Sequence, residues 1–248
     1  MTEPTTTTPP PTAATRPSFL QEVKDNLTRV PVPYHEPPAV VLRRRIAVAV
    51  VAVVGAAVLG YSLSRPAGDE SFYWLTFALA AVWTLGALIS RPLHLGHVRF
   101  FGRNQRPVIT GTFIGLLLGG AFVAGGLFAR EIPALRDYTA AVLEFASHGS
   151  LPLVVLITVI NGLAEELFFR GALYSALEKH HPAIVSTIVY VIVIGASTLN
   201  PMLTFAAVVL GAVCAFERRA TGGVLAPILT HMVWGLIMVL VLPAVFGV

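Results

Sequence analysis

The sequence predicts an all-α protein, a polytopic transmembrane helical bundle of about seven spans. Of its 248 residues, 55% are hydrophobic and only 12% are charged, roughly half the charged fraction of an ordinary soluble domain. Several apolar runs reach the roughly 20 residues that a helix needs to cross a bilayer. No segment shows the alternating ten-residue pattern of a transmembrane β-barrel strand. These observations together place the chain among helical membrane proteins.

The N-terminal segment, residues 1–45, is expected to lie outside the bilayer. Residues 1–17 are mostly Thr, Pro and Ala, a composition that cannot bury enough apolar surface to fold. Residues 18–27 carry apolar side chains such as Phe19 and Val23 at helical spacing. This pattern predicts either a short interfacial helix or a linker. No apolar signal-peptide core precedes the first span.

Seven apolar runs follow, three in the region 46–149 and four in the region 150–248. We interpret them as spans at residues 46–63, 72–90, 108–128, 151–177, 183–199, 202–216 and 224–246. The third run is rich in glycine, which lets membrane helices approach closely. We therefore expect the third span to be central in the bundle.

The distribution of Lys and Arg predicts a cytoplasmic N-terminus. With that orientation, only Arg65, Arg130 and Arg136 of the 17 basic residues fall in outer loops, as the positive-inside rule requires. The basic excess, a net charge of +4, then reflects membrane orientation rather than nucleic-acid binding. We expect a multi-pass protein of the cell (plasma) membrane, specifically a bacterial inner membrane. One cysteine, Cys214, excludes an internal disulfide.

The fourth span contains three charged residues at membrane depth: Glu165, Glu166 and Arg170. Glu166 and Arg170 have i, i+4 spacing with the acid first, which favours an ion pair. Glu165 points about 100° away, on the face of Asn161, and is left to act as a general base. Ionisable groups inside a membrane are functional candidates. The alternative is a structural ion-pair cluster that locks helices together.

His231 lies in the last predicted span, at a depth similar to that of the two glutamates. His231 is about nine residues from the inner end of its apolar run, and Glu165 and Glu166 are about eleven or twelve residues from the inner end of theirs. At 1.5 Å per residue, these depths agree within about one helical turn. A carboxylate and a histidine at one depth could hold an activated water, with or without a metal. The alternative is a hydrogen-bonded packing residue.

The stretch Glu165-Glu166-Leu-Phe-Phe-Arg170 resembles the E-E-x-x-x-R motif of the CAAX-protease and bacteriocin-processing (CPBP, or Abi) family of intramembrane endopeptidases. Residues 216–231, which end at His231, resemble the approach to the third motif of that family, H-x-x-x-N. The resemblance covers about residues 150–240. It implies that Glu165 activates water, that Glu166 and Arg170 support it, and that His231 binds metal or stabilises the oxyanion.

Two positions depart from the family pattern. Ser197 stands where the second motif, F-x-x-x-H, has histidine, and Gly235 replaces the asparagine of the third motif. A metal site of the family type would use Glu165 and His231 to hold Zn²⁺. Catalytic zinc normally keeps three protein ligands, whereas this chain offers at most Glu165, Glu166 and His231. The sequence therefore makes a tightly held zinc ion doubtful.

These residues favour a hydrolase: an intramembrane endopeptidase, of metalloprotease type if zinc binds, that cleaves a membrane-protein or membrane-anchored peptide substrate with a glutamate-activated water. The first alternative is a catalytically degenerate family member that acts as a membrane scaffold, immunity or chaperone-like binding protein. The second is a proton-coupled transporter, which no inverted repeat supports. Besides the lipid bilayer and a substrate, no partner is indicated, and there is no sign of nucleic-acid binding.

Overall fold

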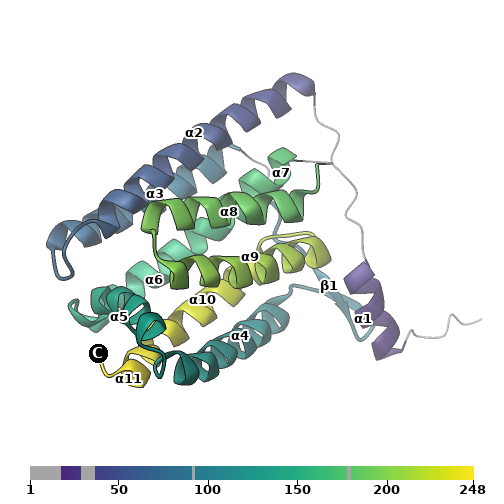
Figure 1. Ribbon diagram of the computed structural model, residues 1–248. Coiled ribbons are helices and arrows are strands. Elements are labelled where there is room, and N and C mark those ends of the chain that lie inside the picture. The colour runs from purple at the N-terminus through teal and green to yellow at the C-terminus, as the bar shows by residue number, and fades with distance from the viewer. Residues whose placement is uncertain (1–17, 29–36, 91–92, 178–179) are drawn as a thin grey trace, which may run out of the picture.

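A computed structural model describes residues 18–28, 37–90, 93–177 and 180–248, and nearly all of its regular structure is helical (Figure 1). A π-helical segment, η1 (Leu167–Leu173), joins α6 to α7, and a two-stranded hairpin of β1 (Val98–Phe100) and β2 (Arg103–Gln105) lies between α3 and α4. The helices are α1 (Phe19–Thr28), α2 (Pro38–Leu63), α3 (Glu70–Ile89), α4 (Val108–Ala129), α5 (Pro133–Ser147), α6 (Leu151–Glu166), α7 (Tyr174–Leu177), α8 (Pro182–Thr198), α9 (Pro201–Thr221), α10 (Leu225–Leu240) and α11 (Leu242–Phe246).

The all-α polytopic bundle predicted from the sequence is confirmed, and the chain is a multi-pass membrane protein. Within the described residues, six helical segments are long and apolar enough to cross a membrane: Pro38–Leu63, Glu70–Ile89, Val108–Ala129, Leu151–Leu177, Pro201–Thr221 and Leu225–Phe246. The remaining predicted span, α8, is apolar but has only 17 residues. Helix α1 and the C-terminus lie at opposite ends of the bundle (Figure 1).

Helix α6 and its π-helical continuation are held inside the bundle. Helix α6 packs between α3 and α10, and α10 in turn packs against α4 and α9. The indole of Trp83 on α3 lies 4.8 Å from the Phe168 ring and 5.1 Å from the Phe169 ring, centroid to centroid. All three side chains are almost fully buried. This aromatic cluster fixes the segment that follows the two glutamates.

Two predicted boundaries differ from the structure, and two elements were not predicted. Helix α2 begins at Pro38, so the arginines 43–45 lie within it rather than before it. Helix α9 runs to Thr221 rather than 216, because Glu217 and Arg218 find partners inside the bundle. The prediction missed α5, which is short and amphipathic, and the hairpin 98–105. Of the two alternatives for residues 18–27, the helix is the one observed.

Helix α4 uses its glycines to approach α10, as the sequence predicted. A Cβ atom at Gly111 would lie 2.6 Å from the carbonyl oxygen of Ala226, and one at Gly115 would lie 2.9 Å from that of Thr230. The expected central position is wrong, because α4 packs at the edge of the bundle, against α10 and α11 (Figure 1). Its glycines serve one face only: added Cβ atoms at Gly120 and Gly125 would meet nothing within 4 Å.

We predict that Gly111→Ala lowers the thermal unfolding midpoint of the detergent-solubilised protein. The new methyl group would meet α10 backbone, which cannot rotate away as a flexible side chain can. Gly120→Ala on the same helix is the matched control, and it should be neutral or slightly stabilising because alanine has the higher helix propensity. Equal midpoints for the two variants would contradict the close approach of α4 and α10.

Candidate functional site

The helix that carries the two glutamates changes to π-helical winding directly after Glu166. The π segment spans Leu167–Leu173, and its residues Phe168, Phe169 and Arg170 have no exposed surface. Short π segments inside α-helices are rare and occur frequently at functional sites. The sequence pattern had predicted a continuous span here and gave no sign of the change.

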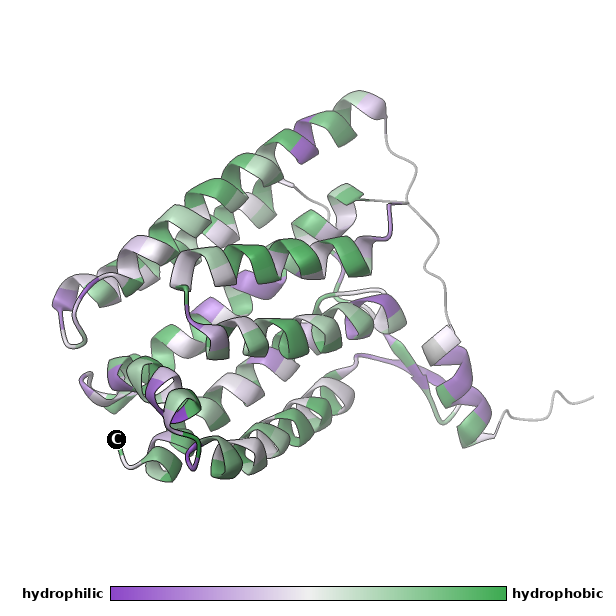
Figure 2. Ribbon diagram, viewed as in Figure 1, coloured by the Kyte–Doolittle hydropathy of each residue, from purple (hydrophilic) through white to green (hydrophobic). Residues whose placement is uncertain are grey.

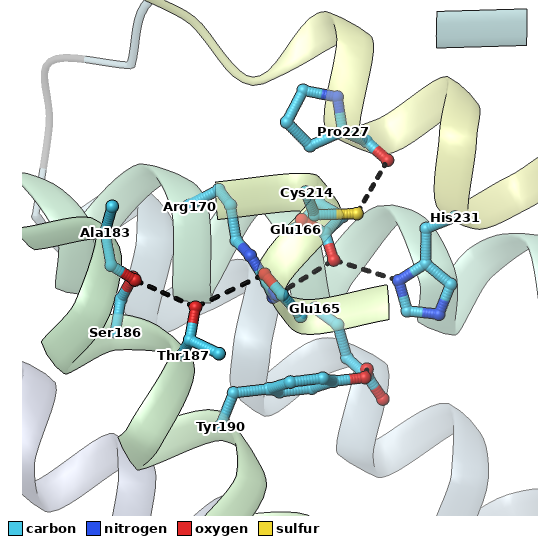
Figure 3. Close-up of polar contacts among 11 residues, drawn as sticks. Glu165, Glu166, Arg170, Ala183, Ser186, Thr187, Tyr190, Cys214, Pro227 and His231 are labelled. Atoms are coloured by element: carbon cyan, nitrogen blue, oxygen red, sulfur yellow. Dashed lines mark hydrogen bonds and ion pairs between the residues drawn. The ribbon is translucent and has the colours of Figure 1, made fainter. Parts of the chain in front are cut away.

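Glu166 is the centre of a buried charge network. Its Oε1 atom lies 3.1 Å from Nη1 of Arg170, which donates to it, and 2.9 Å from Nδ1 of His231 (Figure 3). The Glu166 and Arg170 side chains are fully buried, and His231 is 9% exposed. The predicted i, i+4 ion pair is therefore confirmed. The predicted proximity of His231 to a glutamate is also present, with Glu166 rather than Glu165 as the hydrogen-bonded carboxylate.

Arg170 connects this network to two further helices. Its Nη2 donates to the Gly211 carbonyl on α9 at 3.1 Å, and its guanidinium lies 4.6 Å from the Tyr190 ring centroid on α8, within cation–π range. A Cβ atom at Gly211 would lie 3.1 Å from the Tyr190 ring and 3.4 Å from Nη2. A side chain at Gly211 would therefore crowd the Tyr190 ring, whereas its distance to the guanidinium would be an ordinary van der Waals contact.

Glu165 occupies a different environment from that of its neighbour. It is partly exposed, and its Oε2 accepts a hydrogen bond of 2.9 Å from the Tyr190 hydroxyl (Figure 3). It also interacts electrostatically with His231. Sequence reasoning missed Tyr190. The available signal was a tyrosine inside an otherwise aliphatic run.

His231 is held in one orientation by its surroundings. Its Nδ1 bonds Glu166, and its ring packs against α6 at Gly162, where an added Cβ would lie 3.4 Å from Cδ2. Trp234 meets the imidazole edge-on at 5.9 Å between centroids. A neutral imidazole that donates from Nδ1 keeps Nε2 as a hydrogen-bond acceptor, whereas an imidazolium donates from both nitrogens.

The two positions that depart from the family motifs lie away from the carboxylates. The Ser197 hydroxyl donates to the Ala56 carbonyl on α2 at 2.9 Å. A Cβ atom at Gly235 would lie 3.0 Å from Cγ2 of Thr158, about two turns before Glu165 on α6. The α8 residue that contacts Glu165 is Tyr190, two turns before Ser197.

The donors at this site do not fit a catalytic zinc ion. Among the residues that the structure describes, no group of three or more His, Cys, Asp or Glu side chains is arranged to hold a metal. His231 Nδ1 and Glu166 Oε1 are engaged with each other, and Arg170 shares the same carboxylate. Because catalytic zinc needs about three protein ligands and a water, we assign no reaction step to a metal.

A second buried carboxylate, Glu217, lies beside this network. Thr230 Oγ1 is 2.9 Å from Glu217 Oε1 and 2.9 Å from the Gly111 carbonyl oxygen. A threonine hydroxyl has one proton, and a carbonyl can only accept. One hydroxyl proton cannot fully serve both acceptors, so this geometry predicts that Glu217 carries a proton and donates it to Thr230. Sequence reasoning had placed Glu217 outside the sixth span.

Arg218, the residue after Glu217 on α9, contacts the backbone of Arg170 on the side of the bundle that carries the hairpin. Its Nε donates to the carbonyl oxygen of Arg170 at 2.7 Å, and its guanidinium lies 4.8 Å from the Tyr174 ring centroid. In the connection before the hairpin, partial burial and the positive charge of Arg218 lower the pKa of His94.

A cavity of about 410 Å³ lies between α2, α7 and α8, with Arg45 and His180 at its polar edge. Its remaining lining is aliphatic, and none of Glu165, Glu166, Arg170 and His231 contributes to it. This cavity is therefore separate from the charge network.

Comparison with known families supports the resemblance described above. Residues 147–237 match the family model described as type II CAAX prenyl endopeptidase, Rce1-like, which is the CPBP family. The matched region contains every residue of the charge network, and Tyr190 and Glu217 with them. No curated protein and no solved structure matches the chain.

We predict that infrared spectroscopy of the purified protein detects the carbonyl band of a protonated, hydrogen-bonded carboxylic acid at neutral pH. The band should disappear in Glu217→Gln and shift in Thr230→Val, which removes its hydrogen-bond partner. Glu144→Gln, an exposed glutamate on α5, is the control and should leave the band unchanged. Persistence of the full band in Glu217→Gln would show that Glu217 is ionised.

Proposed function

We propose that this protein is an intramembrane endopeptidase in which Glu165 activates water; the match of residues 147–237 to the Rce1-like family model supports this. The observation that carries the proposal is the contrast between two adjacent carboxylates. Glu166 is fully buried and shared by Arg170 and His231, whereas Glu165 is partly exposed. Neighbouring carboxylates in unlike environments commonly take different catalytic roles.

Glu166 acts as a positioning residue in this proposal. Its charge is used by Arg170 and His231, so it is a poor base for a further proton. Its contact with Nδ1 orients the imidazole of His231 and directs Nε2 to the reacting groups.

Glu165 acts as the general base and then as the general acid. Tyr190 donates to Oε2, which leaves Oε1 to accept a proton from water. The water oxygen bonds to the carbonyl carbon of the substrate peptide, and the carbonyl becomes an oxyanion. A protonated His231 donates from Nε2 to that oxyanion. Glu165 then returns its proton to the amide nitrogen as the carbon–nitrogen bond breaks, which gives a carboxylic acid and an amine.

Two buried polar atoms near these groups support a binding role. Glu166 Oε2 and Asn161 Oδ1 have no hydrogen-bond partner within the described part of the chain. Buried polar atoms are nearly always hydrogen-bonded, so water or the backbone of a bound peptide is a natural partner for them. Asn161 is fixed to α3 through Nδ2, which donates to the Thr76 carbonyl at 3.3 Å.

The substrate class and orientation follow from the same proposal. A reactive carboxylate inside a helical bundle suits a membrane-protein or membrane-anchored peptide. The arginine-rich end of the bundle, which includes the hairpin, faces the cytoplasm by the positive-inside rule. The protein then lies in the plasma membrane with its N-terminus inside.

A binding protein without catalytic activity is the second candidate. It is favoured by Ser197 and Gly235, which replace two polar residues of the family motifs, and by a donor set that does not fit zinc. Such a protein would use the same bundle to hold a membrane partner.

We predict that Glu165→Gln lowers cleavage of a lipid-anchored fluorogenic peptide library by about 10²- to 10⁴-fold in reconstituted vesicles, the usual contribution of a general base. His231→Ala should also lower the rate. The exposed Glu144→Gln is the matched control and should leave it unchanged, as should chelation with EDTA.

Cleavage by Glu165→Gln at the wild-type rate would exclude Glu165 as the base. A wild-type protein that cleaves no library member would favour the binding protein instead. Loss of the wild-type activity on chelation would show that a metal takes part after all.

A further inference from the structure

The hairpin between α3 and α4 presents a phenylalanine in a backbone conformation that costs free energy. Strands β1 and β2 pair antiparallel, with Phe100 opposite Arg103, so Phe101 and Gly102 form a two-residue turn. Their φ angles are +49° and +75°. Tight hairpin turns with two positive φ values favour Asn-Gly or Asp-Gly, and a bulky residue at positive φ is unusual. The strained position therefore holds a side chain that the turn itself does not favour.

Phe101 belongs to an exposed apolar cluster, which we call the aromatic tip: Phe19, Leu20, Phe100 and Phe101. Phe101 is 72% exposed, Leu20 77% and Phe19 50%. The Phe100 ring lies 4.5 Å from that of Phe101 and 5.8 Å from that of Phe19, centroid to centroid. The rings pack on one another and leave their outer faces open, so the fold of the chain does not account for their exposure.

The aromatic tip is held on a rigid support made by α1 and the hairpin. The Asn26 side chain makes two hydrogen bonds with the backbone of Arg99: Nδ2 donates to the carbonyl at 2.8 Å, and Oδ1 accepts from the amide at 3.1 Å. Oε1 of Glu22 accepts a hydrogen bond from the Gly102 amide at 2.5 Å, and Glu22 is 2% exposed. These contacts join α1 to both the first strand and the turn.

Basic side chains surround the aromatic tip. Lys24, Arg99, Arg103 and Arg106 are all exposed. Of the two acids on α1, Glu22 is buried against the turn, and Asp25 accepts a hydrogen bond from Gln21. The exposed surface around the tip therefore combines large apolar groups with positive charge.

The position of the hairpin brings this surface to one end of the bundle. Helix α4, a candidate span, begins at Val108 directly after the hairpin. The preceding residues are tied to the connection between α9 and α10: the His97 amide donates to the Thr221 carbonyl at 2.9 Å, and the Val224 amide donates to the His94 carbonyl at 2.8 Å. Figure 1 shows α1 and β1 beside the ends of α4 and α9. Figure 2 shows that α1 and β1 are more hydrophilic than the long helices.

We propose that the aromatic tip inserts into the interface of the bilayer while Lys24, Arg99 and Arg103 bind the headgroups of anionic phospholipids. Aromatic rings are favoured at the depth of the headgroups, and basic residues next to apolar ones bind anionic leaflets. Burial of the phenylalanine rings in the interface offsets the conformational cost at Phe101. This proposal is independent of the proteolytic function.

The test uses the full chain in nanodiscs of phosphatidylcholine alone and of phosphatidylcholine with phosphatidylglycerol. In a Cys214→Ala background, spin labels are placed at Phe101→Cys and, as the matched control on the same hairpin, at the exposed Asn104→Cys. The label at 101 is expected to collide more with oxygen and less with a water-soluble nickel complex than the label at 104. A label at 101 that is as accessible to nickel as the label at 104, in both lipids, would overturn insertion.

Hydrogen exchange tests the same surface with Phe101 intact. Amides of residues 98–105 in the wild type should exchange more slowly in discs that contain phosphatidylglycerol than in phosphatidylcholine alone. Arg99→Gln with Arg103→Gln should lose most of that difference, and so should the wild type in high salt. Equal exchange in the two lipids would overturn the binding of anionic headgroups and would leave the surface open to a protein partner.

Discussion

The rest of the structure depends on one buried carboxylate, that of Glu166, which Arg170 and His231 share. Removing charged groups from water costs several kcal/mol per ion, and only close, well-oriented interactions offset that cost. Here these interactions connect α6, η1, α9 and α10, because Arg170 also bonds the Gly211 carbonyl on α9 and His231 comes from α10. The network therefore sets the rotation of α6 and the depth of α10, and with them the place of Glu165.

The surrounding packing keeps that network in position. Phe168 and Phe169 pack on Trp83, so the π-helical turn after Glu166 is stabilised by side chains on a neighbouring helix. Glycines lie at these helix contacts: a Cβ at Gly111 would clash with the α10 backbone, and Gly162 and Gly211 are within van der Waals distance of the imidazole and the guanidinium. Each of these positions lies where two helices meet closely, which is the usual use of small residues in membrane bundles.

The sequence was sufficient for the features that depend on local spacing and composition. Apolar runs predicted the long helices, and the i, i+4 spacing predicted the ion pair of Glu166 with Arg170. Matching depths brought His231 to the glutamates, but depth along a helix does not determine which carboxylate it meets. The roles of Tyr190 and Glu217 were not predictable, because they depend on the rotation of α8 and α9 in the assembled bundle. The glycines of α4 predicted close approach but not an edge position, since close approach needs only one partner helix.

A double-mutant cycle of Arg170→Met and Glu166→Gln, measured as the free energy of unfolding in mixed micelles, tests the dependence on the buried carboxylate most directly. Arg170→Met removes the guanidinium partner of a fully buried carboxylate and should destabilise the protein by about 3–5 kcal/mol. Adding Glu166→Gln to it should recover most of that loss, because the carboxylate that lost its guanidinium partner is then removed as well. If the two losses simply added, the residues would not be coupled, and the central role given to the Glu166 carboxylate would be wrong.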